Sequence, residues 1–398
     1  MLDEVIQLDK KYYLNTFGDR LPVCFEKGEG MKLFDDKGNT YYDFLGGIAV
    51  NALGHGHKDF INALKNQLDK VVHTSSLYYI ENQAKLAQKL VENTCAEKAF
   101  FANSGAEANE GAFKLAKIYY YKKGLDKYEI ITLDKSFHGR TLATVAATGQ
   151  EKYQKPYRPL TPGFKQVEPN NFKAIEDAVT DKTAAIMIEL IQGESGVHPM
   201  DKEYVEKLRK LCDEKDIILI FDEVQTGMGR TGYLFAHQMY GVEPDIFTSA
   251  KALGGGIPIG AVCAGKKVAS AFEPGDHGTT FGGNPFATAA GLAVFDIFEK
   301  EHLVENAGKM GKYFKEKLTE LQNKYSDKIT DVRNAGLLIG IQLEDSIAKT
   351  VFNKLFENKM LTSLCGGNTI IIAPPLIIKE TDIDLFINTL SSILEHSC

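Results

Sequence analysis

Short apolar runs alternate with amphipathic stretches through the middle of the chain. The runs are rich in branched residues, as β-strands are, and they cover residues 129–133, 184–190, 217–221 and 246–249. A helical pattern at 202–215 separates two of them. Nearly continuous apolar strands of this kind are typical of a parallel sheet with helices on both faces. The pattern therefore predicts an α/β fold for roughly residues 52–300.

The pattern changes after about residue 300. A long charged amphipathic helix is predicted first, and it is followed by a strand, a helix, a second strand and a final helix, with the helix at 303–324 and the strands at 336–343 and 369–372. This order predicts a smaller α+β domain. We expect three parts: an N-terminal segment, 1–51, that contributes to the small domain; a large domain, 52–300; and a C-terminal small domain, 301–398.

Composition narrows the class of protein. The chain has 398 residues, of which 44% are hydrophobic, with 46 basic against 53 acidic side chains. A net charge of −7 argues against a nucleic-acid partner. No signal peptide is evident, and no apolar run approaches the roughly 20 residues needed to cross a bilayer. We expect no membrane contact and a cytoplasmic location.

Cysteine spacing argues against disulfides and against a metal. The cysteines contain no C-x-x-C pair and lie at positions 24, 95, 212, 263, 365 and 398. Such scattered spacing predicts neither a disulfide framework nor a zinc site and fits a reducing compartment. His55 and His57 form an H-x-H pair without a third ligand in view, so we interpret both as local structure.

A small-residue turn follows the apolar run at 99–102. It contains Ser104, Gly105 and Ala106, and a helical stretch begins there. Exposed backbone N–H groups, a capping hydroxyl and the positive end of the helix dipole can hold a phosphate group without a lysine. The alternative is an ordinary helix cap.

Two carboxylates follow the apolar run at 217–221. Asp222 and Glu223 would lie at the carboxyl end of a parallel strand, which faces the ligand crevice in an open sheet. A carboxylate there can bind a metal, act as a general base, or pair with a protonated ring nitrogen. The alternative for this segment is a helix cap or a surface salt bridge.

Lys251 follows another strand-like run and precedes three glycines. A lysine in a crevice among small residues can lose solvent and form a Schiff base with an aldehyde. The glycines lack the strand, G-x-G-x-x-G and helix order of a dinucleotide site, which disfavours a nicotinamide-dependent oxidoreductase. A phosphate cradle, a carboxylate and a lysine are together the three requirements of pyridoxal 5'-phosphate.

Longer motifs carry a resemblance to a known family. They are Gly47-Ile48-Ala49-Val50-Asn51, Asn103-Ser104-Gly105-Ala106-Glu107, Phe137-His138-Gly139-Arg140-Thr141, Gln192-Gly193-Glu194, Asp222-Glu223-Val224-Gln225-Thr226-Gly227, Gly229-Arg230-Thr231-Gly232, Ala250-Lys251 and Gly278-Thr279-Thr280-Phe281. From about Arg20 to the last helix, the chain resembles class III (ω-type) aminotransferases, and within them the subgroup that acts on N2-acetylornithine.

The resemblance implies a fold-type I pyridoxal-phosphate transferase, a homodimer with its active site at the subunit interface. Lys251 and Asp222 would be catalytic: the lysine would carry the cofactor and move a proton, and the carboxylate would pair with the pyridine nitrogen. The cofactor-binding residues would be Ser104, Gly105, Ala106, Phe137, Asp222, Glu223, Val224, Gln225 and Lys251, with Thr280 from the other subunit. Glu223 would act behind the ring, as a supporting acid or salt-bridge partner, and His138 would be structural.

The resemblance implies that Arg140, Glu194 and Thr279 bind the substrate. Arg140 would hold a substrate carboxylate, a planar task for which lysine is a poor substitute. One departure stands out: where the family usually has a second carboxylate-binding arginine, before Pro374-Pro375, this chain has Ile371. Loss of that cation removes roughly 1.5–3 kcal/mol of charge-assisted hydrogen bonding. Glu194 is the usual partner of that arginine in the family. In this chain it would either pair with another cation or attract the ammonium group of a diamine-like substrate. Arg333 is the nearest arginine in sequence, and we expect it to be structural.

The implied reaction moves the terminal amino group of N2-acetylornithine to 2-oxoglutarate in a ping-pong cycle, a step of arginine biosynthesis. The alternative is another ω-aminotransferase, acting on ornithine, on a diamine such as putrescine, or on 4-aminobutyrate. A racemase of the same fold is a further alternative. A cofactor-binding protein without turnover is disfavoured, because a scaffold would need neither Lys251 nor Asp222.

Overall fold

A seven-stranded sheet forms the centre of the structure. The computed structural model describes residues 1–396. The strand order is β4-β12-β11-β10-β7-β5-β6, with β4 at Lys98–Ala102, β5 at Glu129–Leu133, β6 at Phe164–Val167, β7 at Thr183–Ile188, β10 at Ile218–Asp222, β11 at Ile246–Ser249 and β12 at Gly260–Ala264. Only β12 runs antiparallel to its neighbours. The predicted mostly parallel sheet is confirmed.

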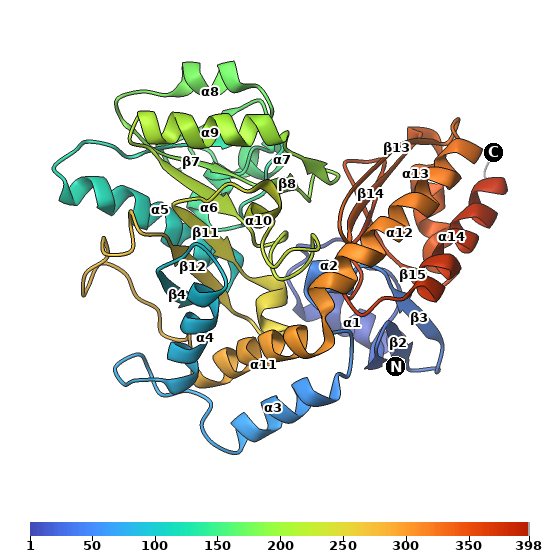
Figure 1. The fold of residues 1–398 in the computed structure, drawn as a ribbon. Coiled ribbons are helices and arrows are strands. Elements are labelled where there is room, and N and C mark those ends of the chain that lie inside the picture. Colours follow the sequence, from blue (N-terminus) through green and yellow to red (C-terminus); the bar gives the residue numbers. More distant parts are fainter. Residues whose placement is uncertain (397–398) are drawn as a thin grey trace.

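Helices cover both faces of this sheet (Figure 1). The helices of this part of the chain are α3 at Lys58–Leu68, α4 at Glu81–Glu92, α5 at Gly105–Lys122, α6 at Leu142–Ala147, α7 at Glu151–Gln154, α8 at Phe172–Ala178, α9 at Lys202–Glu214, α10 at Ala236–Tyr240 and α11 at Pro285–Glu301, with short 3-10 turns η1 at Lys155–Tyr157 and η2 at Lys251–Gly254. Alternate residues of β10 divide between two cores: Ile218 and Ile220 pack in the cluster that contains α5, whereas Leu219 and Phe221 pack in the one that contains α9. Burial on both faces explains why the strand is apolar throughout.

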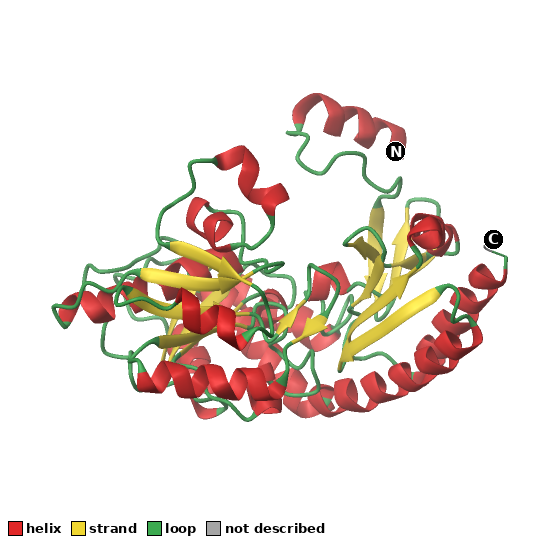
Figure 2. Cartoon of the chain, turned by 90° about the horizontal axis from the view of Figure 1, so that it is seen from above, coloured by secondary structure: helices red, strands yellow, loops and turns green. Residues whose placement is uncertain are grey.

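Two smaller sheets lie beside the large one. The C-terminal sheet has the antiparallel order β13-β14-β17-β16, with β13 at Ile329–Ala335, β14 at Leu338–Leu343, β16 at Ser363–Cys365 and β17 at Thr369–Ile372. Helices α12 at Leu303–Lys324, α13 at Asp345–Glu357 and α14 at Glu380–Glu395 cover it, as Figure 2 shows from above. The predicted α+β arrangement is therefore present.

The other small sheet joins the two ends of the chain. Its order is β1-β2-β3-β15, with β1 at Phe25–Glu29, β2 at Lys32–Asp35, β3 at Thr40–Asp43 and β15 at Met360–Leu361. Strand β15 pairs with β3 in parallel register, so residues before 51 share a sheet with residues after 301. A two-stranded ribbon, β8 at Ile191–Gln192 and β9 at His198–Pro199, and a short helix, α2 at Gly46–Ala49, complete the inner elements.

The first helix, α1 at Leu2–Tyr12, lies apart from the body of the molecule and has no buried residue (Figure 2). The sequence pattern did not predict it. Among the described residues, no helix is long and apolar enough to cross a membrane, and no group of three potential metal-ligating side chains occurs.

Candidate active site

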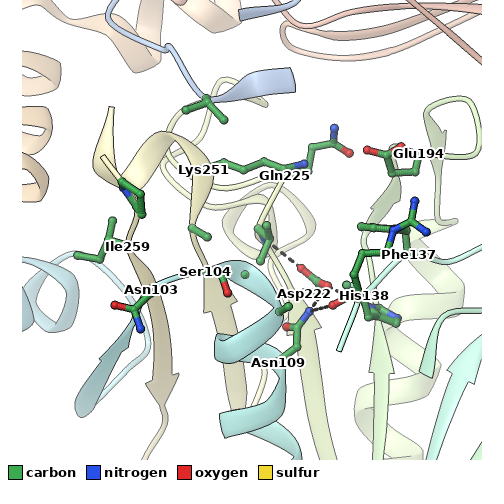
Figure 3. Close-up of a pocket in the computed structure, with 18 of the residues that line it drawn as sticks. Asn103, Ser104, Asn109, Phe137, His138, Glu194, Asp222, Gln225, Lys251 and Ile259 are labelled. Carbon is green, nitrogen blue, oxygen red and sulfur yellow. Dashed lines mark hydrogen bonds and ion pairs between the residues drawn. The ribbon is translucent and has the colours of Figure 1, made fainter. Parts of the chain in front are cut away.

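The carboxyl ends of β10 and β11 and the start of α5 meet around one cavity of about 430 Å³ (Figure 3). It brings together most of the residues singled out in the sequence, which are Ser104, Gly105, Ala106, Phe137, Arg140, Glu194, Asp222, Val224, Gln225 and Lys251. These residues lie up to 147 positions apart in sequence, between 104 and 251. The fold therefore places the predicted phosphate cradle, carboxylate and lysine at one site.

The start of α5 is closed by reciprocal side-chain caps. The Ser104 hydroxyl accepts a hydrogen bond from the Glu107 N–H at 3.2 Å, and the Glu107 carboxylate accepts one from the Asn103 N–H at 2.8 Å. The amides of Gly105 and Ala106, which come first in the helix, line the cavity. A Cβ on Gly105 would lie 2.7 Å from a methyl carbon of Val224, so only glycine allows α5 to start this close to the end of β10.

Asp222 is buried and its carboxylate has three hydrogen-bond donors. Oδ1 accepts from the Val224 N–H at 3.0 Å, and Oδ2 accepts from His138 Nδ1 and Asn109 Nδ2, each at 2.8 Å. The dashed lines of Figure 3 join these side chains. Donors on both oxygens hold the carboxylate in one orientation, and a carboxylate placed in this way can pair with a protonated ring nitrogen. His138, expected to be structural, holds the orientation of Asp222.

Asn109 is a site residue that sequence reasoning missed. Its Nδ2 donates to the His138 carbonyl at 2.7 Å as well as to Asp222, and its Oδ1 accepts from the Thr248 hydroxyl at 2.7 Å. One buried amide thus connects α5, β10, β11 and the loop of His138. The only signal in the sequence was a polar residue within a helix that packs against the sheet.

Lys251 lies directly after β11 on an unusual backbone. Its φ is +44°, in the left-handed region where a residue with a Cβ is strained. Burial lowers the pKa of its ammonium group, and three nearby acidic groups oppose that shift; these belong to Glu194, Asp222 and Glu189. A lowered pKa favours the uncharged amine, which is the nucleophilic form.

Glu189 is a second residue that the sequence analysis did not single out. It is buried at the end of β7, lines the cavity, and accepts a hydrogen bond from the Phe137 N–H at 2.8 Å. Burial, followed by the charge of Asp222, raises its pKa well above the usual value of 4.5. The carboxyl is therefore protonated at a pH where an exposed glutamate is ionised.

Arg140 supplies a cation at the cavity. Its guanidinium lies 4.0 Å from the centre of the Tyr153 ring and 5.5 Å from that of Phe137. No ion pair to Arg140 occurs within residues 1–396. Aromatic stacking fixes the plane of the group while its N–H donors stay available for a carboxylate.

Glu194 also lacks a cation partner: among the described residues no lysine, arginine or histidine forms an ion pair with it. Ile371 is 4% exposed in β17, opposite Gly340 of β14. Thr369 lies on the same face of the sheet as Ile371. A Cβ added to Gly196 would lie 3.4 Å from the Thr369 hydroxyl, so the two residues are close neighbours. That face of the sheet therefore packs toward the loop of Glu194.

Arg333 shares this face but is used elsewhere. Its guanidinium donates to the Gly196 carbonyl at 3.0 Å, to Gln342 at 2.8 Å and to Asp331 at 2.5 Å. These contacts hold β13 against the 193–197 loop. They fit the structural role expected for it.

Three of the predicted residues lie away from the cavity. The carboxylate of Glu223 is turned to α10, where it accepts hydrogen bonds from His237 Nδ1 and the Ala236 N–H. It therefore supports the strand end and has no free oxygen aimed at a cofactor. Thr279 and Thr280 line a separate cavity of about 370 Å³, and the Thr279 hydroxyl lies 3.4 Å from Asn103 Nδ2.

The two histidines read as local structure have local partners. His55 Nε2 lies 2.7 Å from the Asp43 carboxylate. His57 caps α3 and lies 3.0 Å from a Glu301 oxygen. Neither faces the cavity, which fits the interpretation from sequence.

The family model for "Aminotransferase class-III" matches residues 13–394. The chain belongs to the class-III aminotransferases. Among curated members of this family, the chain is 50% identical to the acetylornithine aminotransferase of Methanocaldococcus jannaschii, covering 98% of this chain and 97% of that protein. It is 48% identical to the enzyme of the same name from Caldanaerobacter subterraneus subsp. tengcongensis, covering 98% and 99%.

Solved class-III structures agree with the fold. The ornithine aminotransferase of Toxoplasma gondii superposes with a TM-score of 0.94 at 30% identity and covers 99% of this chain and 95% of its own. The acetylornithine aminotransferase of Elizabethkingia anophelis superposes with a TM-score of 0.88 at 34% identity, covering 99% and 98%. A second structure of the Toxoplasma protein is described with pyridoxal phosphate at its active site.

The cavity fits pyridoxal phosphate on its own geometry. The first amides of α5 offer a phosphate cradle, Asp222 offers a buried, hydrogen-bonded carboxylate for the ring nitrogen, and Lys251 offers an amine of lowered pKa. When bound, the cofactor supplies an aldehyde carbon and an electron-accepting ring. This class-III aminotransferase is a pyridoxal-phosphate enzyme, and the predicted cofactor is confirmed.

Proposed function

We propose that the chain transfers the terminal amino group of N2-acetylornithine to 2-oxoglutarate, in the biosynthesis of arginine. The proposal is carried by 50% and 48% identity, over nearly the full length, to proteins named acetylornithine aminotransferase. The cavity supports it with the guanidinium of Arg140, which has no ion-pair partner within residues 1–396 and can bind a substrate carboxylate. Both the donor and the acceptor of this reaction carry such a carboxylate.

In this proposal each residue has a separate task. Lys251 would carry the cofactor, and its Nζ, when released as an amine, would accept and return a proton, because its lowered pKa favours the unprotonated form. Asp222 keeps a proton on the ring nitrogen. Arg140 orients each substrate through two parallel hydrogen bonds to its carboxylate.

A second candidate donor rests on Glu194. This half-buried carboxylate lies at the cavity with no cation paired to it among residues 1–396, and the face of β17 beside its loop carries Ile371. Free ornithine, putrescine or 4-aminobutyrate could be the donor if Glu194 binds an ammonium group. The wild-type preference among donors decides between the two.

The assembly and the location belong to the same proposal. Two copies would form a homodimer, with Thr280 of the partner subunit completing the phosphate site, since Thr280 of the same chain lies outside the cavity. We place the enzyme in the cytoplasm, where free thiols stay reduced; Cys24, Cys95, Cys212, Cys263 and Cys365 are all unpaired.

Steady-state kinetics test the proposal. The cofactor-loaded protein is given 2-oxoglutarate with N2-acetylornithine, ornithine, putrescine or 4-aminobutyrate in turn, and glutamate formation is measured. We expect kcat/KM for N2-acetylornithine to exceed that for each other donor by at least tenfold. A diamine or ornithine that matches it would overturn the substrate assignment and favour the Glu194 alternative.

A further inference from the structure

Cys95 lies in a cluster that the active site does not use. It is half-buried between α4 and β4, and it lines two surface cavities of about 530 and 770 Å³. Its Sγ lies 3.8 Å from Nε2 of His237 in α10. Neither residue lines the active-site cavity.

The imidazole beside Cys95 is held in one orientation. His237 Nδ1 lies 2.8 Å from Glu223 Oε1, and the same carboxylate accepts hydrogen bonds from the His237 N–H and the Ala236 N–H. The ring also stacks on Phe235, with centroids 5.9 Å apart. Nε2 is therefore aimed at the sulfur, and the cluster places a thiol, an imidazole ring and an orienting carboxylate in line, as in an activated thiol.

Charge in this cluster favours a reactive sulfur. Burial by itself lowers the pKa of His237, but hydrogen bonds to Cys95 and Glu223 outweigh it and raise that pKa to about 9. The ring is then an imidazolium at neutral pH, with Nδ1–H donating to Glu223 and Nε2–H donating to sulfur. The Cys95 sulfur therefore lies 3.8 Å from a positively charged donor, a setting in which cysteines react readily.

We propose that Cys95 is a nucleophilic thiol, aligned by His237 and Glu223, and that it is a modification site for small soft electrophiles and low-molecular-weight disulfides. The proposal does not depend on the substrate assigned above. The two cavities that meet at Cys95 give such a reagent access to the sulfur and room for the group that it leaves behind.

The chemistry balances with these groups alone. The thiol proton passes to solvent, because His237 already holds both ring protons. With an alkyl iodide, the new bond joins sulfur to carbon and iodide leaves with the electron pair of the carbon–iodine bond. With a disulfide, Cys95 bonds to one sulfur, the S–S bond breaks, and the other half leaves as a thiolate.

The chain contains its own matched controls. Cys24 is also half-buried and unpaired, and so is Cys365, although burial raises the pKa of the Cys365 thiol; neither forms a contact with a histidine among the described residues. The full-length, cofactor-loaded protein is treated with limiting iodoacetamide at neutral pH, and the modification of each cysteine is followed by peptide mass spectrometry. We expect Cys95 to react at least tenfold faster than Cys365 and Cys24. A rate within twofold of either control would overturn the proposal.

A substitution tests the role of the imidazole. His237→Asn removes the Nε2 contact, and we expect the Cys95 rate to fall to that of Cys365 while the other cysteines keep theirs. An unchanged Cys95 rate in a variant whose circular dichroism matches wild type would contradict the proposal. If that variant does not fold, the wild-type comparison with Cys365 still decides the question.

A disulfide probe tests the second reagent class. With 2-hydroxyethyl disulfide, we expect the mixed disulfide to form first at Cys95 and to be absent from the Cys95→Ser variant at that position. Prior formation at Cys24 or Cys365 would count against the proposal.

Discussion

The two halves of the active-site cavity differ in how their charged groups are satisfied. On the cofactor half, Asp222 is buried and has donors on both oxygens, from Val224, His138 and Asn109. On the substrate half, Arg140 and Glu194 have no ion-pair partner within residues 1–396. The cofactor half is therefore preorganised, whereas the charged side chains of the substrate half stay available to bind substrate.

This difference is what a ping-pong enzyme needs. The cofactor stays in place through the cycle, so a rigid network can hold it without reorganisation. Two different substrates must enter the other half in turn, and a charge already paired within the protein would have to be released before binding. The cofactor half thus determines the chemistry and the substrate half determines which molecules take part.

Replacement of Lys251 is expected to have the largest effect. Lys251→Ala removes the amine that bonds to the cofactor and moves the proton, and we expect kcat to fall by about 10⁴-fold or more. Turnover with N2-acetylornithine measures it. Lys266→Ala, at an exposed lysine, is the control and should match wild type. Activity in Lys251→Ala above about 1% of wild type would contradict the assignment.

Asp222→Asn is expected to follow. A neutral amide no longer favours the protonated ring nitrogen, and its NH2 group would face donors that now bond to the carboxylate. We expect kcat to fall by about 10²–10³-fold for every donor, together with a shift of the cofactor's visible absorbance. A fall in kcat confined to one donor would contradict the assignment, because the cofactor half should act in the same way on every donor.

Arg140→Lys separates the two halves. Lysine keeps the charge but loses the bidentate geometry, and a loss of roughly 1.5–3 kcal/mol corresponds to about 10–150-fold. We expect that loss mainly in KM for N2-acetylornithine and for 2-oxoglutarate, with kcat less changed. Putrescine, which has no carboxylate, is the control. An equal loss with putrescine would contradict the proposed carboxylate contact.

Glu189→Gln is expected to have the smallest effect, on stability. The folded-state pKa of Glu189 is raised, so between pH 4.5 and that pKa the folded protein holds a proton that the unfolded chain has lost. The contribution of this proton to the free energy of unfolding is complete below pH 4.5, and it is lost as pH rises through the folded-state pKa of Glu189. Gln does not titrate, so the free energy of unfolding of the variant should rise relative to that of wild type as pH rises through the folded-state pKa of Glu189.

Urea unfolding of the cofactor-free proteins between pH 4.5 and 8 measures this difference. The amide oxygen of Gln can still accept a hydrogen bond from the Phe137 N–H, as Glu189 does at 2.8 Å. The two proteins therefore differ in the ability of residue 189 to titrate and not in this hydrogen bond. A difference between the two proteins that is independent of pH would mean that Glu189 is ionised in the folded state.

The main elements could be predicted because many residues share one pattern. The runs at 129–133, 246–249 and 303–324 coincide with β5, β11 and α12, since burial of a whole face sets the periodicity. The start of β7 and the end of β10 differ by one residue from the prediction. The division at residues 51 and 300 stays a prediction, which the pairing of β15 with β3 supports.

Single residues were harder to predict. Long motifs led to Lys251, Asp222 and Arg140, but Asn109 and Glu189 belong to no pattern and act only through neighbours distant in sequence. Glu223 shows the reverse: it follows the last residue of β10 directly, but its side chain is turned to His237 and does not share the surroundings of Asp222. Roles that depend on a contact partner need the fold.

The most direct test of this account is the half-reaction of the wild-type enzyme with glutamate. Arg140 is the free cation that we assign to the substrate carboxylate, while the β17 face at Ile371 offers none. Loss of the cofactor's visible absorbance is followed after mixing with glutamate or with N2-acetylornithine. We predict saturable conversion by both, at limiting rates within about tenfold of each other. No conversion by glutamate, with fast conversion by the other donor, would contradict 2-oxoglutarate as the acceptor.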